Sequence, residues 1–269
     1  MILVKLLLKS EAGRPKSEVK NSIKGVSQTE RDSERAYMLE FVTTADGSKT
    51  IYNSEVGENY HSRNGALQES RHVFLNSGLK YFLGRKDIKE VSILEVGFGT
   101  GLNFLLSADY CTTNNIMLQY TGIEAYPLSS GFISQTGYGQ YVSEAIWDSF
   151  LKQYPNSLKE FVEVNPDCKL RIADSKLSDF NSEKQYDVIY FDAFASANQP
   201  EMWSEEAITH TIKFLKPGGV FVTYAITGNL KRALKSHGFK VEKALGAPGK
   251  REMLRAIKGV DTPLVSHNL

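Results

Sequence analysis

The stretch Val91–Tyr110, VSILEVGFGTGLNFLLSADY, decides the fold of this chain. Its first six residues have the nearly continuous apolar pattern of a strand buried on both faces, and its last nine carry apolar residues at helical spacing. Gly97, Gly99 and Gly101 lie between them, where glycine lets the backbone turn sharply and approach a ligand closely. The stretch therefore predicts a strand, a ligand-binding turn and a helix.

The alternation of strand and helix continues along the chain. Further strands are expected at 117–125, 168–174, 186–192 and 220–225, and helices at 65–82, 143–154, 202–215 and 229–238. Strands separated by helices indicate an α/β fold with a doubly wound, mostly parallel sheet, of the Rossmann-like kind. A β-hairpin is predicted near the N-terminus from the turn ADGS, and an antiparallel hairpin of 239–245 with 251–257 closes the sheet.

The length and composition indicate one large domain. The chain has 269 residues, 41% of them hydrophobic, and a formal net charge of +1. Patterned sequence begins at Met38, so we expect 1–37 to be a disordered or non-native extension, 38–258 the domain and 259–269 a C-terminal tail. No apolar run approaches the ~20 residues that span a bilayer, so no membrane association is expected.

The two cysteines, Cys111 and Cys168, have no CxxC spacing, and the histidines are not clustered as metal ligands. We therefore expect neither a disulfide framework nor a metal site. Free thiols also favour a reducing, cytoplasmic location.

Acidic residues end three of the expected strands. Glu95 gives the glycine turn the pattern acid-x-GxGxG, which resembles the motif of S-adenosyl-L-methionine (SAM) methyltransferases and departs from the dinucleotide fingerprint GxGxxG. Glu124 is placed to accept from the ribose hydroxyls of a nucleoside, and Asp174 from its adenine amino group. Each could be only a solvated acid at a strand end. Together they favour a bound nucleoside, because ligands bind along this edge of open α/β sheets.

Asp192 ends the next strand and begins the loop DAFASANQPEMW. A carboxylate there can orient an amine nucleophile, accept its proton and stabilise the developing positive charge. Phe194 and Trp203 could stack on a base, and Asn198 and Gln199 could bind its edge. The structural alternative is that the two aromatic side chains belong to the core.

Four ordered motifs make the resemblance specific. They are YHSRNGALQESRHVFL (60–75), ILEVGFGTGLNFL (93–105), FDAFASANQPEMW (191–203) and GAPGKREML (246–254). Over roughly residues 38–258 the chain resembles the methyltransferase domain of the MnmC-like tRNA 5-aminomethyl-2-thiouridine methyltransferases. The resemblance implies SAM-dependent methylation of the aminomethyl nitrogen on wobble uridine, with Asp192 as the catalytic residue. It also assigns Tyr60, Gly65 and Glu69 to the active region, with Glu69 on the cofactor and Tyr60 on the substrate.

Two departures from that family pattern matter. Ser196 stands where proline is common in the loop, which makes the rigidity of the loop less assured. The FAD-dependent oxidase domain of the bifunctional enzymes is missing, because the chain ends soon after REMLRAIKG. We therefore expect a protein that only methylates, together with a separate FAD-dependent oxidase or upstream enzymes that aminomethylate the tRNA.

Basic residues concentrate near the C-terminal end. Between Lys231 and Lys258 there are nine Lys and Arg against two Glu, a local charge of +7 that suits phosphate contacts. Lys250 and Arg251 are the preferred contacts to the tRNA anticodon loop, although an ordinary solvated face is the alternative. His61 and His72 are expected to be surface or helix residues and not catalysts.

Two other functions remain open from the sequence. A small-amine methyltransferase or an aminopropyltransferase of the spermidine-synthase type shares the glycine turn, the ribose acid and the strand-end aspartate. The loop after Asp192 has no further acid until Glu201, which favours a base-like substrate over a polycation. A non-catalytic RNA-binding protein on the same scaffold would not need the intact glycine turn or Asp192.

Overall fold

The computed structural model of the chain describes residues 38–85 and 88–260. The expected extension 1–37 and residues 261–269 of the expected tail lie outside the described residues. The described residues from Phe41 onward form one compact unit, and of a second unit only Met38–Glu40 are described. None of the described helices is long and apolar enough to cross a membrane.

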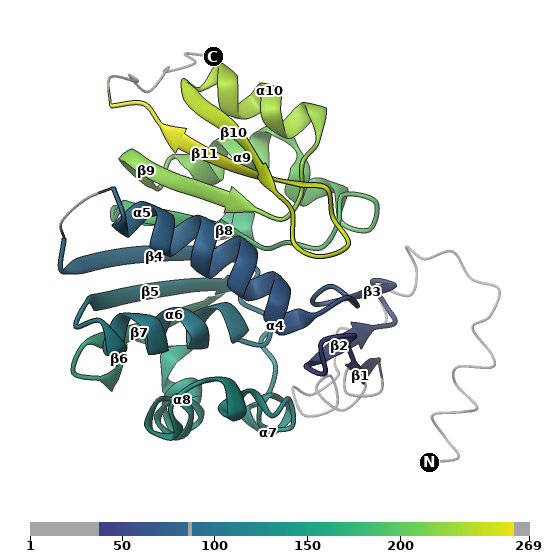
Figure 1. Cartoon of the computed structure of the whole chain (residues 1–269), viewed down its shortest axis with the longest axis vertical. Coiled ribbons are helices and arrows are strands. Elements are labelled where there is room, and N and C mark those ends of the chain that lie inside the picture. Colours follow the sequence, from purple (N-terminus) through teal and green to yellow (C-terminus); the bar gives the residue numbers. More distant parts are fainter. Residues whose placement is uncertain (1–37, 86–87, 261–269) are drawn as a thin grey trace. The chain divides into compact units, whose positions relative to one another are not determined.

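An eight-stranded sheet has the order β10-β11-β9-β8-β4-β5-β7-β6 (Figure 1). Its parallel strands are β4 (Glu90–Val96), β5 (Met117–Glu124), β7 (Cys168–Asp174), β8 (Tyr186–Phe191) and β9 (Leu215–Thr223). The antiparallel strands are β6 (Val162–Asn165), β10 (Phe239–Leu245) and β11 (Glu252–Lys258). The predicted mostly parallel α/β sheet and its C-terminal antiparallel hairpin are confirmed. Strand β6 was not predicted.

Strand β8 shows why the central strands are apolar throughout. Helices cover both faces of the sheet (Figure 1), so successive side chains of β8 all meet a protein interior. Tyr190 packs against Phe74, with the ring centroids 5.3 Å apart, on one face. Ile189 and Phe191 lie on the other face, in a core completed by side chains of helices α9 (Glu205–Ile212) and α10 (Gly228–Ser236).

A long helical segment crosses the first of these faces. It consists of α4 (Ala66–Glu69), η1 (Ser70–Lys80) and α5 (Tyr81–Leu83), and confirms the helix predicted over 65–82. Its central part is wound as a π-helix, a rare form that is frequent at functional sites and that the sequence did not predict. Gly78 permits its close approach to the sheet, because a Cβ there would lie 2.8 Å from Cε1 of Tyr190.

The remaining helices lie between the strands. They are α6 (Leu102–Thr113), α7 (Ser130–Ser134), η2 (Tyr138–Tyr141), α8 (Glu144–Ser157), η3 (Leu177–Asp179) and η4 (Pro200–Trp203). The helix predicted at 202–215 is shorter than expected. It begins after Ser204, whose hydroxyl accepts from the amide of Ala207, and the chain already enters β9 at Leu215.

The predicted N-terminal hairpin is also confirmed. Strands β1 (Leu39–Thr43) and β2 (Lys49–Asn53) form a separate sheet with the short β3 (Glu58–Asn59). Asp46 in the turn accepts hydrogen bonds from the amides of Ser48 at 3.0 Å and Gln68 at 2.9 Å. The hairpin turn is thereby fastened to helix α4.

Candidate functional site

The four predicted acids lie along one edge of the sheet. Because the strand order is β8-β4-β5-β7, the sequence of acids along that edge is Asp192, Glu95, Glu124 and Asp174. Glu124 and Asp174 are register partners at the ends of their strands. Asp192 therefore lies next to Glu95. Asp192 and Asp174 are at the two opposite ends of the series. This order separates Glu124 and Asp174, the acids predicted to bind a nucleoside, from the half of the edge that holds Asp192.

The glycine turn has the backbone that its sequence predicts. Gly97, Gly99 and Gly101 have φ angles of 84°, 53° and 78°, a region that favours glycine. The amide of Gly99 donates to Oε2 of Glu124 at 2.9 Å, while Oε1 of Glu124 accepts from the amide of Tyr126 at 3.0 Å. The turn thus orients the acid of the neighbouring strand.

Phe98, between the glycines, anchors the turn in the core. It packs in an aromatic cluster that includes Phe104 and Tyr120. Gly122 on β5 makes room for it, since a Cβ at that position would lie 2.4 Å from Cδ2 of Phe98. This apolar anchor, which the sequence analysis did not identify, keeps the glycine turn at the end of β4.

Asn103 in the first turn of α6 joins two of the acids. Its Nδ2 donates to Oε1 of Glu95 and to Oδ2 of Asp192, both at 2.8 Å. The second oxygen of Glu95 accepts from the hydroxyl of Tyr120 at 2.8 Å. Glu95 is only 1% exposed. Its burial, and the negative charge of Asp192, raise the pKa of the Glu95 carboxyl well above its ordinary value.

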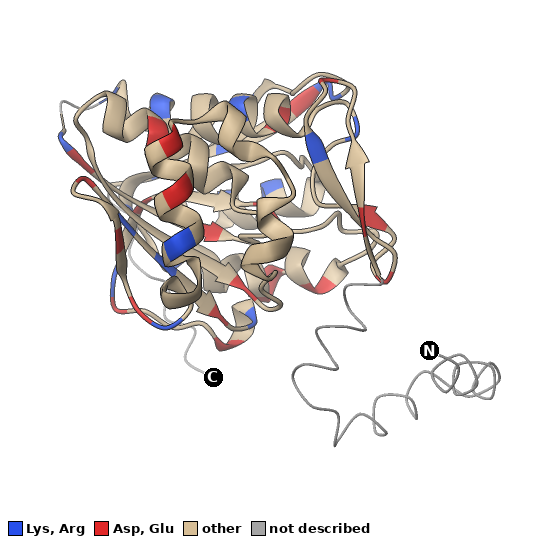
Figure 2. Cartoon of the chain, turned by 90° about the horizontal axis from the view of Figure 1, so that it is seen from below, with Lys and Arg blue, Asp and Glu red and all other residues tan. Residues whose placement is uncertain are grey.

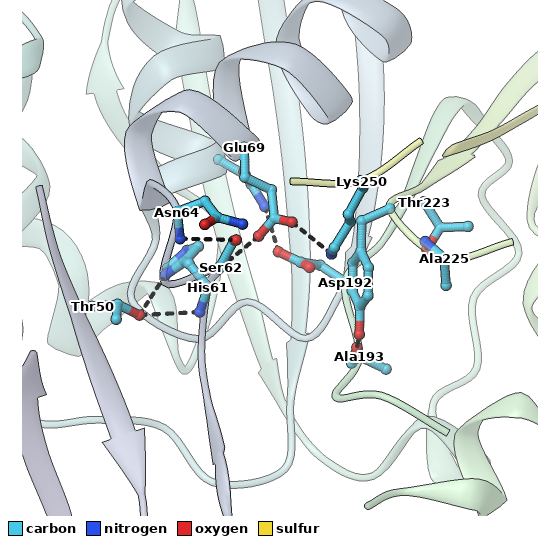
Figure 3. Close-up of polar contacts among 12 residues, drawn as sticks. Thr50, His61, Ser62, Asn64, Glu69, Asp192, Ala193, Thr223, Ala225 and Lys250 are labelled. Atoms are coloured by element: carbon cyan, nitrogen blue, oxygen red, sulfur yellow. Dashed lines mark hydrogen bonds and ion pairs between the residues drawn. The ribbon is translucent and has the colours of Figure 1, made fainter. Parts of the chain in front are cut away.

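Asp192 faces both a carboxylate and a cation (Figure 3). Burial and the charge of Glu69 raise the pKa of Asp192 well above its ordinary value, while Asn103 and Lys250 act in the opposite direction. Glu69 is 6% exposed; its Oε1 lies 2.8 Å from Nζ of Lys250, and its Oε2 accepts from the amide of Ser62 at 2.8 Å. Lys250, expected to contact RNA, points toward this buried carboxylate.

The loop after Asp192 places an aromatic pair beside the edge. The rings of Phe194 and Tyr60 meet edge to face, 5.2 Å apart. Trp203 supports the loop from the core side: its indole N–H donates to the carbonyl of Phe194 at 2.7 Å, and its ring packs against Phe191. We therefore assign Trp203 a supporting role, whereas Phe194 is half-buried at the site.

Asn198 is exposed, and its amide donates to Oε2 of Glu58 at 2.9 Å. The same carboxylate oxygen accepts from the amide of Ala195 at 2.9 Å. Glu58 therefore fixes the loop from β3. Asn198 would have to leave this contact to bind a base.

Two histidines differ in their surroundings. His61 was expected at a surface or on a helix, but it is buried, with Thr50 as its hydrogen-bonding partner. Burial lowers the pKa of His61 to about 4, so the ring is neutral at physiological pH. His72 lies on the helical segment, and its Nε2 is 2.7 Å from the carbonyl of Leu245.

Much of the basic C-terminal segment is engaged within the protein. Arg255 and Lys240 both pair with Glu242, and Lys243 pairs with Glu252. The ammonium of Lys258 is buried against backbone carbonyls. Basic and acidic residues are interspersed along the ribbon (Figure 2). The basic residues that stay exposed or half-buried outside such pairs are Lys231, Arg232, Lys235 and Arg251.

Two surface hollows lie apart from the acidic edge. One, of about 470 Å³, is lined by residues such as Phe180, His210 and Phe214, and the other, of about 430 Å³, by Asp46, Arg71 and others. Neither is lined by an acid of the edge. No group of His, Cys, Asp and Glu among residues 38–85 and 88–260 is arranged to hold a metal ion.

Sequence reasoning missed several residues of this site. They are Asn103, Tyr120, Glu58 and Tyr224, the last of which donates its hydroxyl to the carbonyl of Ala193 at 2.9 Å. The sequence could have indicated Asn103, because it is an amide residue in the first turn of a mainly apolar helix. It could have indicated Tyr120 as well, as a hydroxyl in a strand buried on both faces. Glu58 and Tyr224 act through tertiary contacts that have no local pattern.

A family described as S-adenosyl-L-methionine-dependent methyltransferase matches residues 141–259. The chain is similar to proteins named tRNA 5-methylaminomethyl-2-thiouridine biosynthesis bifunctional protein MnmC. The protein of Acinetobacter baylyi is 28% identical over 226 residues, which is 79% of this chain and 36% of that protein. The protein of Idiomarina loihiensis is 32% identical over 209 residues, which is 72% of this chain and 34% of that protein.

The chain thus spans about a third of the length of the curated relatives it matches. Among solved structures, the fold is similar to the crystal structure of MNMC2 from Aquifex aeolicus. That comparison has a TM-score of 0.65 at 20% sequence identity, and covers 98% of this chain and 83% of the other.

Proposed function

We propose that this chain, whose residues 141–259 match a family of S-adenosyl-L-methionine-dependent methyltransferases, transfers a methyl group to a tRNA wobble base. The acceptor group is the 5-aminomethyl nitrogen of (2-thio)uridine, and the product is 5-methylaminomethyl-2-thiouridine. The names of the curated relatives support this acceptor over a small amine or an aminopropyl acceptor. The observation that carries the proposal is the position of Asp192, between the glycine turn and the aromatic pair of Phe194 and Tyr60.

The residues of the edge fit the cofactor. Oδ1 of Asn103 is a buried acceptor without a hydrogen-bonding partner in the described part of the chain, which suits the ammonium group of a methionine moiety. Glu124, held by the glycine turn, would accept from the ribose hydroxyls, and the exposed Asp174 from the adenine amino group. Glu95, which accepts from Asn103, and Glu69 are two further carboxyl groups of the site. When bound, SAM supplies a methyl group made electrophilic by its sulfonium.

Asp192 is assigned the proton transfer. The acceptor nitrogen attacks with its lone pair and must therefore be a neutral amine. Formation of the new N–C bond would break the C–S bond of SAM and leave its electron pair on sulfur. The resulting ammonium nitrogen gives one proton to the Asp192 carboxylate, which passes it to solvent. Only an ionised Asp192 can do this.

The RNA contacts we propose follow from exposure. Phe194 and Tyr60 form the apolar surface for the base, which is accessible in an anticodon loop without opening a duplex. Arg251 remains an exposed phosphate contact beside the site, together with basic residues of α10. The aminomethyl group would be supplied by an FAD-dependent oxidase activity or by other tRNA-modifying enzymes. The buried free thiols of Cys111 and Cys168 support the cytoplasmic location.

The test uses tRNA from a strain that lacks this gene. The purified chain is incubated with that tRNA and SAM, and the nucleosides are analysed by mass spectrometry. We expect 5-aminomethyl-2-thiouridine to gain one methyl group. Asp192→Asn should abolish turnover while calorimetry still detects SAM binding, and the exposed control Asp179→Asn should behave as wild type. Absence of the methylated nucleoside with wild-type protein that binds SAM would refute the proposed acceptor.

A further inference from the structure

We propose that Lys250 is a positioning residue of the methyl-transfer site, whose ammonium holds the Asp192 carboxyl in its ionised, proton-accepting form. This inference rests on the proposed function, because it takes Asp192 as the proton acceptor. It replaces the expectation that Lys250 contacts RNA phosphate. Arg251, the next residue, keeps the solvent-exposed position.

The position of the Lys250 ammonium is defined on two sides. Its Nζ lies 2.8 Å from Oε1 of Glu69 and 3.8 Å from the ring centroid of Tyr224. The hydroxyl of Tyr224 donates to the carbonyl of Ala193 at 2.9 Å, so the ring that faces the ammonium is itself fixed to the residue after Asp192. Figure 3 shows Lys250 and Asp192 converging beside Glu69. A carboxylate and an aromatic face are both stabilising neighbours for an ammonium.

The loop that carries Lys250 is built to hold this position. Gly249 has a φ of 87°, and a Cβ there would lie 1.9 Å from Nδ2 of Asn64. A Cβ at Gly246 would lie 2.3 Å from the carbonyl oxygen of Lys250, and the amide of Lys250 donates to the carbonyl of Ala247 at 2.8 Å. The loop is therefore closely packed on both sides, which fits a fixed cation and not a side chain that swings out to RNA.

The charges around Asp192 explain why a cation matters there. The ionisable groups that face it from the packed elements are Glu58 of β3, Glu69 of α4, Glu95 of β4, Tyr120 of β5, Tyr224 after β9 and Lys250. Three of these are carboxyls, which oppose ionisation of Asp192, and Lys250 is the cation in the set. The positive charge of Lys250 favours the charged form of the Asp192 carboxyl.

Burial distinguishes this ion pair from those on the surface. The side chains of Glu69 and Lys250 are 7% and 33% exposed, whereas Glu252 and Lys243 of a surface pair are 36% and 55% exposed. Exposed pairs are screened by solvent and contribute little. Withdrawing Lys250 to meet a phosphate would leave Glu69 buried without its counter-charge, which is strongly unfavourable. Lys243→Met is therefore the matched control for loss of a lysine charge.

Removing the charge of Lys250 and removing the charge of Glu69 should have opposite effects on the pH dependence of turnover. Activity requires ionised Asp192, so kcat at saturating SAM and tRNA falls on the acidic side. Lys250→Met should move that acidic limb up by about one pH unit or more, and Glu69→Gln should move it down. At a pH within the wild-type limb, Lys250→Met then loses about tenfold in kcat while Glu69→Gln gains. Lys250→Arg should restore the wild-type limb, and Lys243→Met should leave it unmoved.

The result that overturns the inference is loss of activity by the same factor at every pH in both Lys250→Met and Glu69→Gln, which would indicate a purely structural ion pair. If Lys250→Met raised the KM for tRNA but left the acidic limb of the kcat profile unchanged, Lys250 would be a phosphate contact and the inference would be wrong. Failure of the proposed function is distinguishable, because wild-type protein would then make no methylated nucleoside at any pH. Should Lys250→Met not fold, Glu69→Gln and Lys250→Arg carry the same test.

Discussion

Replacing Gly97 with alanine should uncouple Asp192 from the glycine turn. A Cβ at Gly97 would lie 2.4 Å from the backbone carbonyl oxygen of Asp192, although ordinary contacts of this kind begin near 3.4 Å. The Asp192 backbone, whose amide donates to Val96 at 2.8 Å, must therefore move by about 1 Å. If Asp192 is the proton acceptor as proposed, a displacement of that size is expected to lower kcat by about 100-fold.

The stability cost of Gly97→Ala has two parts. The φ of 84° adds about 1 to 2 kcal/mol for any residue with a Cβ, and the clash about 1 to 3 kcal/mol more. Gly47→Ala is the matched control, since Gly47 has a φ of 82° but open space around its Cβ position. In both variants we expect the midpoint temperature of thermal unfolding to fall by about 2 to 4 °C for each kcal/mol of lost stability. We expect kcat to fall only in Gly97→Ala. Equal kcat in the two variants would refute the link between the turn and Asp192.

Three further predictions concern the surroundings of the site. The His61 ring is buried and neutral with a pKa of about 4, below its unfolded value of 6.5, so the unfolded chain takes up the proton first as the pH falls. Between pH 7 and pH 5 wild-type protein should therefore lose about 2 kcal/mol of unfolding free energy that His61→Gln retains, measured by denaturant titration. Trp203→Phe removes the hydrogen bond to Phe194 and should raise the KM for tRNA while leaving SAM affinity unchanged by calorimetry; equal loss of both would contradict a loop-supporting role. Arg251→Glu should weaken tRNA binding and lower the slope of log K against log salt by about 1, and an unchanged slope would place the phosphate contacts elsewhere.

The sequence predicted the sheet because its central strands are long apolar runs bounded by glycine and acidic residues. It predicted the acids of the edge for the same reason: parallel strands end together, so strand-end residues such as Glu95 and Glu124 meet without any knowledge of side-chain packing. Strand β6 was missed because its four residues, VEVN, are too short for a pattern. The sequence also could not predict that Asp192 neighbours Glu95, since chain order and strand order differ.

The contacts made by long side chains were the least predictable part. Lys250 and Arg251 have the same charge and adjacent positions, yet one lies against a buried carboxylate and the other stays exposed. That difference arises from the glycines of the loop and from Asn64, almost 190 residues earlier. Composition therefore indicated a basic RNA-binding face where the folded chain uses several of its cations internally.

The insertion of β11 between β9 and β10 has a consequence for biosynthesis. On the ribosome β10 emerges before β11, but its hydrogen-bonding partner in the sheet is β11, so it must wait unpaired until the last strand has been translated. The parallel strands can assemble earlier, whereas the loop with Lys250 reaches Glu69 only when this late strand docks. A nascent polypeptide halted before Lys250 would hold Glu124 and Asp174 on their strands and lack the ammonium that pairs with Glu69.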